Sequence, residues 1–297
     1  MRKNHTTKIS IQAVCLLAAL LALPAAAAAQ SRSVAVGDGP GSVAFDGTNV
    51  WVTNQFSNSV SKLSSAGAVL GTYAVGKNPT GVAFDGTNVW VTNSADNSVM
   101  KLTTGGALLG TYAVGGGPES VLAAGSHIWV ANGKGNSVTK LSRDGTVLGT
   151  YPVGRRPVGL ATDGSNIYVT NNKDNTVTKL SAEGLVLGTF PVGDGPYGIA
   201  FDGTFIWVSN FFSRNVMKLS SLGAVVGTYA VGDGAAGVAV AGGYVWVANN
   251  GSDTVTQLSG TGAVVGTYPV GKDPLGVASA GGSVWVANSG SNSVTKR

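Results

Sequence analysis

Short apolar runs alternate with turn-forming residues along the chain from about residue 31 onwards. In the stretch 79–117, residues 81–84 form an apolar run that ends at Asp85-Gly86, a dipeptide that tolerates the positive φ of a tight hairpin turn. Three further runs in this stretch are rich in β-branched and aromatic residues: 88–92, 98–102 and 108–114. The pattern predicts four short strands, named a to d in chain order, joined as an antiparallel meander.

This unit recurs with a period of 39 residues, which is typical of a repeat architecture. An aromatic residue marks strand b in every unit: Trp51, Trp90, Trp129, Tyr168, Trp207, Trp246 and Trp285. Strand a carries small residues, whereas strands b and d carry Trp and Tyr. Sheets that crowd at a central axis and diverge outwards have this size gradient, so each unit is predicted to be a propeller blade.

The two ends of the repeat region complete one another. The last unit stops in strand c, at Lys296-Arg297, and residues 33–37 match residues 72–76, which form the end of strand d. Closing the last blade with the N-terminal strand removes an open sheet edge. The sequence therefore predicts an all-β, seven-bladed β-propeller of four-stranded antiparallel blades.

The first 29 residues differ in kind from the rest. Arg2, Lys3 and Lys8 precede an apolar stretch over 11–29, and three alanines offer a cleavage site before Gln30. This predicts a signal peptide at 1–29, a single propeller domain at 30–297, and a secreted or periplasmic protein. Cleavage would remove the only cysteine and lower the formal net charge from +5 to +2, so net charge gives no reason to expect nucleic-acid binding.

The strand b sequence Tyr168-Val169-Thr170-Asn171 is the signature of the YVTN-type β-propeller repeats, and Trp51 to Asn54 is a close variant. The chain resembles that family from Ser33 to Arg297. Proteins with similar repeats include secreted binding proteins and surface-layer proteins, and related propellers include lactonases and a streptogramin-inactivating lyase. The resemblance thus implies the fold and leaves the activity open.

Ligands of propellers usually bind over the channel, on the face formed by the d-to-a and b-to-c loops. The residue that follows the first residue of strand a varies from blade to blade, and Glu119 and Tyr197 have the most reactive side chains there. Nearby loops of blades three to five add a basic and aromatic set: Lys134, Arg155, Arg156, Lys173, Phe211, Phe212 and Arg214. We expect this sector to bind an anionic or aromatic ligand; the alternative is that these are solvated loop charges and locally packed rings. A single-stranded nucleic acid could use the same mixture.

Chemistry by a histidine is not expected. After the signal peptide the only histidine is His127, in the a-to-b turn of blade three, about 16 Å along the blade from Glu119. The streptogramin lyase, as the resemblance implies, relies on histidine, glutamate and a metal ion, and this chain lacks the matching histidine. We therefore expect no catalytic residue, no metal and no cofactor.

Three repeated polar sets are expected to be structural. The asparagine that ends each strand b is predicted to cap the following turn, and Asp46, Asp85, Asp163 and Asp202 to form hairpin turns. Lysines recur on strand c, with Gln257 in blade six; their stems are expected to lie on apolar neighbours, and a basic belt for an anionic surface is the alternative. Loop 171–175 has oxygen-rich side chains but lacks the spacing of a known calcium motif.

We expect a monomeric, non-catalytic module that binds a small anionic or aromatic ligand or a protein partner. Two other classes remain open. One is a hydrolase or lyase at the channel mouth with Glu119 and Tyr197 as acid and base. The other is a structural surface-layer component.

Overall fold

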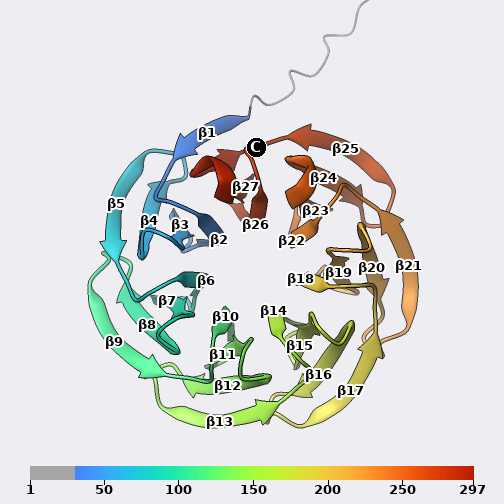
Figure 1. Ribbon diagram of the computed structural model, residues 1–297, viewed down its shortest axis with the longest axis horizontal. Coiled ribbons are helices and arrows are strands. Elements are labelled where there is room, and N and C mark those ends of the chain that lie inside the picture. The colour runs from blue at the N-terminus through green and yellow to red at the C-terminus, as the bar shows by residue number, and fades with distance from the viewer. Residues whose placement is uncertain (1–30) are drawn as a thin grey trace, which may run out of the picture. The chain divides into compact units, whose positions relative to one another are not determined.

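The computed structural model describes residues 31–297, which form seven four-stranded sheets around an open centre (Figure 1). The predicted signal peptide lies outside the described residues, and export stays a prediction. Among residues 31–297 no helix is long and apolar enough to cross a membrane. The predicted all-β propeller is confirmed.

Six blades are meanders of four consecutive strands, with strand a at the channel and strand d at the periphery (Figure 1). Blades one to three comprise β2 (Pro40–Phe45), β3 (Asn49–Asn54), β4 (Ser59–Ser64), β5 (Val69–Ala74); β6 (Pro79–Phe84), β7 (Asn88–Asn93), β8 (Ser98–Thr103), β9 (Leu108–Ala113); and β10 (Pro118–Ala124), β11 (His127–Asn132), β12 (Ser137–Ser142), β13 (Val147–Pro152). Blades four to six comprise β14 (Pro157–Thr162), β15 (Asn166–Asn171), β16 (Thr176–Ser181), β17 (Val186–Pro191); β18 (Pro196–Phe201), β19 (Ile206–Asn210), β20 (Asn215–Leu219), β21 (Val225–Ala230); and β22 (Ala235–Ala241), β23 (Tyr244–Asn249), β24 (Thr254–Ser259), β25 (Val264–Pro269).

Blade seven joins the two ends of the propeller. It contains β26 (Pro274–Ala280), β27 (Ser283–Asn288) and β28 (Ser293–Lys296), and its outer strand is β1 (Arg32–Ala35). β1 pairs antiparallel with β28, with Ser33 opposite Thr295. Two single-turn 3-10 helices, Asn250–Ser252 and Ser289–Ser291, lie in the b-to-c loops of blades six and seven. The closure predicted from the repeat phase is confirmed.

The core consists of layers between neighbouring blades. Trp51 is fully buried and packs against Val82, Val89 and Leu102 of the next blade. In blade one Asp46 accepts the Trp51 indole N–H at 2.7 Å and two N–H groups of its own turn, so the predicted hairpin role of this aspartate is confirmed. Burial raises the pKa of Asp46, but these hydrogen bonds outweigh it and the net pKa is lowered.

The asparagines that end strand b are structural, but they do not cap the turn as predicted. All seven are fully buried. In blade one the Asn54 side-chain amide donates to the hydroxyls of Ser59 and Ser61 on strand c, both at 3.0 Å. The side chain also fills the space beside Gly37, where a Cβ would lie 2.7 Å from Asn54 Cγ. The asparagine thus fastens strand b to strand c and requires a glycine in the loop beside it.

The strand c lysines connect neighbouring blades. Each ammonium lies over the aromatic ring of its own strand b and donates to a carbonyl in the c-to-d turn of the next blade, at 2.6–2.9 Å: Lys62 to Thr104, Lys101 to Arg143, Lys140 to Ala182, Lys179 to Ser221, Lys218 to Gly260 and Lys296 to Ser65. We call these contacts the lysine clasps. They hold the ammonium groups between blades, which argues against the alternative of a free basic belt.

Blade six lacks a clasp for a structural reason. Its strand c carries Gln257, and the neighbouring blade seven has no c-to-d turn because its strand d is β1. A lysine there would find no turn carbonyl. Instead Gln257 accepts a hydrogen bond from Tyr268, and the Arg297 guanidinium lies 3.4 Å from the Tyr268 ring centre.

Candidate active site at the channel mouth

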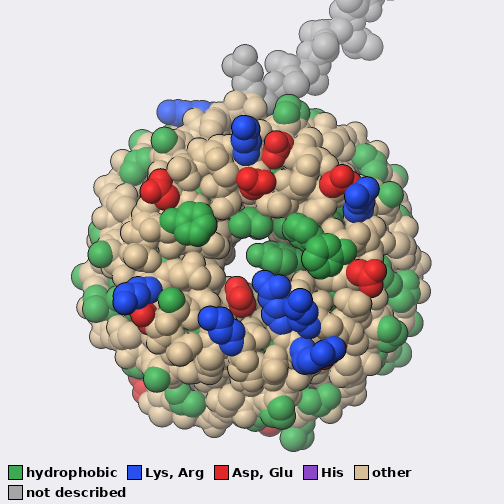
Figure 2. All heavy atoms as spheres, viewed as in Figure 1, with side chains coloured by type: hydrophobic (Ala, Val, Ile, Leu, Met, Phe, Trp, Pro, Cys, Tyr) green, Lys and Arg blue, Asp and Glu red, His purple; other side chains and the backbone are tan. Residues whose placement is uncertain are grey.

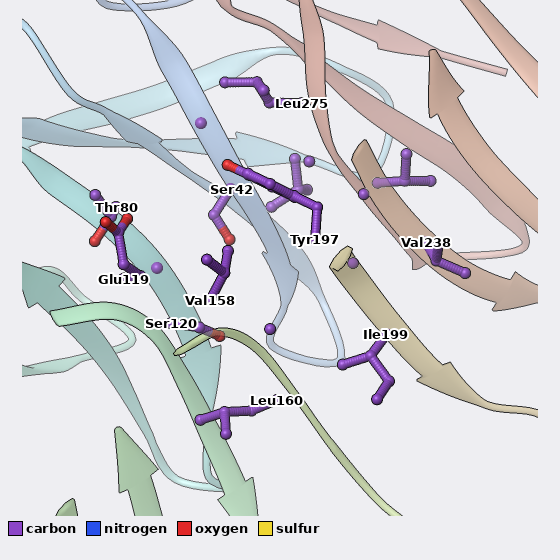
Figure 3. A pocket seen from close by; sticks show the side chains of 18 of the residues that line it. Ser42, Thr80, Glu119, Ser120, Val158, Leu160, Tyr197, Ile199, Val238 and Leu275 are labelled. Carbon is purple, nitrogen blue, oxygen red and sulfur yellow. The ribbon is translucent and has the colours of Figure 1, made fainter. Parts of the chain in front are cut away.

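The inner strands enclose a cavity of about 180 Å³ at the axis of the propeller (Figure 3). Every blade contributes residues of strand a to it. Among its lining residues Glu119 is the only one with an acidic side chain, and Tyr197 contributes a phenol. In Figure 3 the Tyr197 side chain extends across the cavity, with its hydroxyl towards the side on which Thr80 and Glu119 lie. The two residues singled out from the sequence therefore share one site.

A β-bulge at the start of each inner strand presents these residues to the channel. In blade three Pro118 pairs with Asn132 and Ser120 with Ala131, so Glu119 is the extra, unpaired residue. Bulges turn a side chain away from the direction that regular pleating would give it. In blade one the same bulge is held by Thr53, whose hydroxyl accepts the Ser42 N–H at 2.9 Å.

Glu119 occupies space that its own blade leaves free. A Cβ on Gly133, in the b-to-c loop, would lie 2.7 Å from Glu119 Cγ. The corresponding residue in the other blades always has a side chain: Gln55, Ser94, Asn172, Phe211, Asn250 and Ser289. Burial raises the pKa of the Glu119 carboxyl, and the positive charges of Arg156 and then Lys134 partly oppose that rise. Burial, together with the Glu119 charge, raises the pKa of Tyr197 to about 12, with Arg156 acting in the opposite direction.

The predicted basic residues differ in whether they are ion-paired. Arg155 is ion-paired with Asp174, and Arg214 with Asp233 at 3.2 Å. Arg156 and Lys134 have no carboxylate within 4.0 Å among residues 31–297, and both act on Glu119. Lys173 is exposed, and none of the five basic residues is among those that line the cavity itself. Basic and apolar side chains gather around the opening on the face seen in Figure 2.

In loop 171–175 the only carboxylate belongs to Asp174, which is engaged by Arg155. It accepts the Arg155 backbone N–H as well as the guanidinium. This carboxylate is therefore engaged within the protein, and the loop has no second one to offer a calcium ion.

The predicted aromatic residues form a stack beside the cavity. The Tyr197 and Phe211 ring centres are 6.3 Å apart, and Phe211 meets Phe212 edge-on at 5.2 Å. Phe211 is part of the core between blades, whereas Phe212 is 70% exposed and covers Gly195. The alternative of a locally packed ring thus holds in part for Phe211, whereas the Phe212 ring is exposed and accessible to a ligand.

Sequence reasoning missed two residues of blade one. Gln55 lines the cavity, and Phe56 is 73% exposed and covers Gly39 as Phe212 covers Gly195. Phe56 precedes Phe212 by four repeat periods, so comparing the b-to-c loops of all seven blades, rather than of three, reveals it.

The site does not fit a metal ion. The described residues hold no group of three or more His, Cys, Asp or Glu side chains that could bind one. At the channel mouth a single carboxylate lies near two cationic side chains, which repel a divalent cation. His127 begins β11 and pairs with Ala124, at the end of the hairpin opposite to Glu119.

Known structures share this architecture. A streptogramin B lyase superposes with a TM-score of 0.81 at 18% identity, over 90% of this chain and 96% of that one. The virginiamycin B lyase of Staphylococcus aureus gives 0.80 at 18%, over 90% and 98%. Hydrazine synthase of Kuenenia stuttgartiensis gives 0.78 at 19%, over 87% and 95%. At these identities the likeness concerns the fold alone, and no curated protein matches the chain.

A family model provides the assignment. The model of the virginiamycin B lyase family matches residues 28–297. A family of enzymes contradicts the expectation of a non-catalytic binding module, and it agrees better with the lyase alternative. Because the match covers nearly the whole chain, this protein belongs to the virginiamycin B lyase family.

Proposed function

We propose that this protein is a lyase that acts at the channel mouth with Glu119 as the catalytic base. The observation that carries the proposal is the setting of Glu119, the one acidic side chain lining the cavity, held in a bulge beside Tyr197 and near Arg156 and Lys134. Membership of a lyase family supports the reaction class.

The side chains suit elimination from an ester or lactone. Glu119 takes a proton from the carbon next to a carbonyl group, the electron pair of that C–H bond forms a C=C bond, and the C–O bond on the adjacent carbon breaks. The oxygen leaves with the bonding electrons as a carboxylate. A carboxyl with a raised pKa is a stronger base than an ordinary one, and the protonated Tyr197 hydroxyl and the two cations would stabilise the developing negative charge.

The activity of a solved structural neighbour depends on a histidine. A Staphylococcus aureus virginiamycin B lyase is catalytically inactive when one histidine is replaced by alanine, in a structure with quinupristin. In residues 31–297 the only histidine is His127, at the far end of the β10–β11 hairpin. We therefore propose the base from this chain's own carboxylate, with esters and lactones as the substrate class and virginiamycin B as the first compound to test.

The test compares two glutamate variants. Turnover of an ester and lactone panel that includes virginiamycin B is followed by the appearance of the conjugated C=C bond, and Glu119→Gln is expected to lower it at least about 100-fold. Glu183→Gln, which changes an exposed glutamate outside the cavity lining, serves as the matched control and should leave turnover unchanged. Equal rates in Glu119→Gln and the unmodified protein would refute Glu119 as the base.

A further inference from the structure

Arg156 is held in a backbone conformation that an arginine rarely adopts. Its φ is +52°, in the left-handed region. Four other blades have a glycine at this loop position and two have a short polar residue: Gly39, Gly117, Gly195, Gly234, Asn78 and Asp273, all with positive φ. A strained residue in a loop beside a cavity is a reason to look for a function.

The side chain of Arg156 points to that function. Its guanidinium reaches Asn172 Oδ1 at 3.4 Å and opposes the burial-induced rise in the pKa of both Glu119 and Tyr197. It has no ion-pair partner among the described residues, unlike Arg155 and Arg214. This leaves the planar fork of the guanidinium available to a ligand at the channel mouth.

The surroundings of Arg156 define the chemistry of the ligand. Lys134 adds a second free cation from the adjoining loop, where its stem covers Gly117. Phe212 lies over Gly195, the corresponding position in the next blade, and contacts the Tyr197–Phe211 stack through Phe211. Figure 2 shows Lys and Arg side chains and hydrophobic side chains bordering the same opening.

We infer that Arg156 is a specificity-determining residue that pairs with a carboxylate of an aromatic ligand at the channel mouth. The inference rests on the proposed function for its location, since it concerns the same channel mouth. A guanidinium binds a carboxylate through two parallel hydrogen bonds, and an aromatic ring is well placed on an exposed phenylalanine. Arginine at a position that six blades fill with smaller residues is then retained for binding and not for folding.

The experiment measures the binding of an unreactive probe by calorimetry at low ionic strength. Phenylacetate carries both features, phenylacetamide lacks only the charge, and a thymidine oligonucleotide represents a nucleic acid. Arg156→Asn places in blade four the residue that blade two has as Asn78, so the backbone is accommodated. Arg214→Asn is the matched control, because it also removes an arginine with positive φ but breaks an ion pair away from Glu119.

We expect the unmodified protein and Arg214→Asn to bind phenylacetate, and Arg156→Asn to bind it at least about tenfold more weakly. The melting temperature of Arg156→Asn should equal or exceed that of the unmodified protein, which shows that lost binding is not lost folding. The inference would be overturned if Arg156→Asn bound phenylacetate as tightly as the unmodified protein does. It would also be overturned if the unmodified protein bound phenylacetamide as tightly as phenylacetate, or bound only the oligonucleotide. Absence of phenylacetate binding at millimolar concentration would overturn it as well.

The binding assay separates this inference from the proposed reaction. Phenylacetate binding needs no turnover, so a Glu119→Gln variant that retains full turnover would refute the base and leave the anion site standing. The converse outcome is that Glu119→Gln loses turnover while Arg156→Asn still binds phenylacetate as tightly as the unmodified protein. That result would refute the anion site and leave Glu119 as the base.

Discussion

At the scale of single residues, the blades differ in how they fill the left-handed positions of their loops. The residue that ends the b-to-c loop is asparagine in five blades and aspartate in one, and its side-chain oxygen accepts a backbone N–H from the d-to-a loop at the start of the next blade, as Asn136 does from Arg156 at 2.9 Å. Blade five has Arg214 instead, with φ +54°. Its guanidinium pairs with Asp233, and the loop contact is lost.

Arg214→Asn is therefore expected to stabilise the protein. Asparagine tolerates the left-handed conformation that costs other residues about 1–2 kcal/mol, and it restores a loop hydrogen bond, whereas the exposed ion pair contributes about 0–1 kcal/mol. The net gain should be about 1 kcal/mol, seen as a rise in Tm of about 3 °C by calorimetry. Arg214→Ala breaks the ion pair without these gains, so its Tm should not exceed that of the unmodified protein. An equal Tm for Arg214→Ala and Arg214→Asn would contradict the explanation.

The raised pKa of Glu119 makes its contribution to the stability of the folded protein depend on pH. Because burial raises its pKa, the folded protein keeps this proton at pH values where the unfolded chain has lost it. The stability it contributes is present below the unfolded pKa of about 4.3 and is lost as pH rises through the folded pKa. The Tm of Glu119→Gln relative to the unmodified protein should thus increase from about pH 4 to about pH 8.

Glu183→Gln is the control for this titration. Hydrogen bonding from the Ser181 hydroxyl lowers the pKa of Glu183, so its replacement should show no such increase. A Tm difference for Glu119→Gln that stays constant across this pH range would show that the carboxyl titrates normally.

At the scale of elements, a strand c is fastened to the following blade by its lysine clasp. Lys101 lies 5.4 Å from the Trp90 ring centre and donates to Arg143 O at 2.7 Å. A hydrogen bond from a charged donor and a cation–π contact at a partly exposed site together contribute about 1–2 kcal/mol.

Lys101→Gln should lower Tm by about 4 °C, because glutamine cannot reach the carbonyl with a charged donor. The matched exchange is Gln257→Lys in blade six, where the next blade has no c-to-d turn. The Tm of Gln257→Lys should therefore equal that of the unmodified protein. A gain in Gln257→Lys as large as the loss in Lys101→Gln would show that the lysines do not act through the turn carbonyl.

At the scale of the whole molecule, one antiparallel pairing closes the ring. β1 and β28 come from opposite ends of the domain, with Ser33 opposite Thr295. In blade one the corresponding pair, Ser61 and Thr72, lies within one hairpin. A cross-link between β1 and β28 would constrain nearly the entire unfolded chain, whereas the cross-link in the hairpin constrains a few residues.

A disulfide made by Ser33→Cys with Thr295→Cys should stabilise the protein by about 3 kcal/mol more than one made by Ser61→Cys with Thr72→Cys. Denaturant unfolding of each variant, oxidised and reduced, measures the two contributions. Equal stabilisation by the two disulfides would contradict this expectation. It would show that stabilisation does not grow with the length of the closed loop, or that the folded propeller strains the disulfide between β1 and β28.

The fold was within reach of the sequence because its determinants are local and repeated. The Asp85-Gly86 turn recurs in three other blades and the aromatic residue at Trp90 in all of them, so a weak signal is strengthened by repetition. Only part of the candidate site could be predicted from the sequence. Glu119 and Tyr197 stand out as departures from the repeat, but Phe56 was missed, and nothing in the order of residues distinguishes the paired Arg155 from the unpaired Arg156.

The sequence by itself determined the number of blades, their strands and the closure of the ring, since each follows from turn chemistry and side-chain size within one period. Tertiary structure alone decided which loop side chains meet. It brought Asp174 to Arg155 and Asp233 to Arg214, left Arg156 free beside Glu119, and placed the lysines on the turns of the next blade. Those partners lie in different loops or blades, so their contacts depend on the curvature of the closed ring and not on the pattern of any one blade.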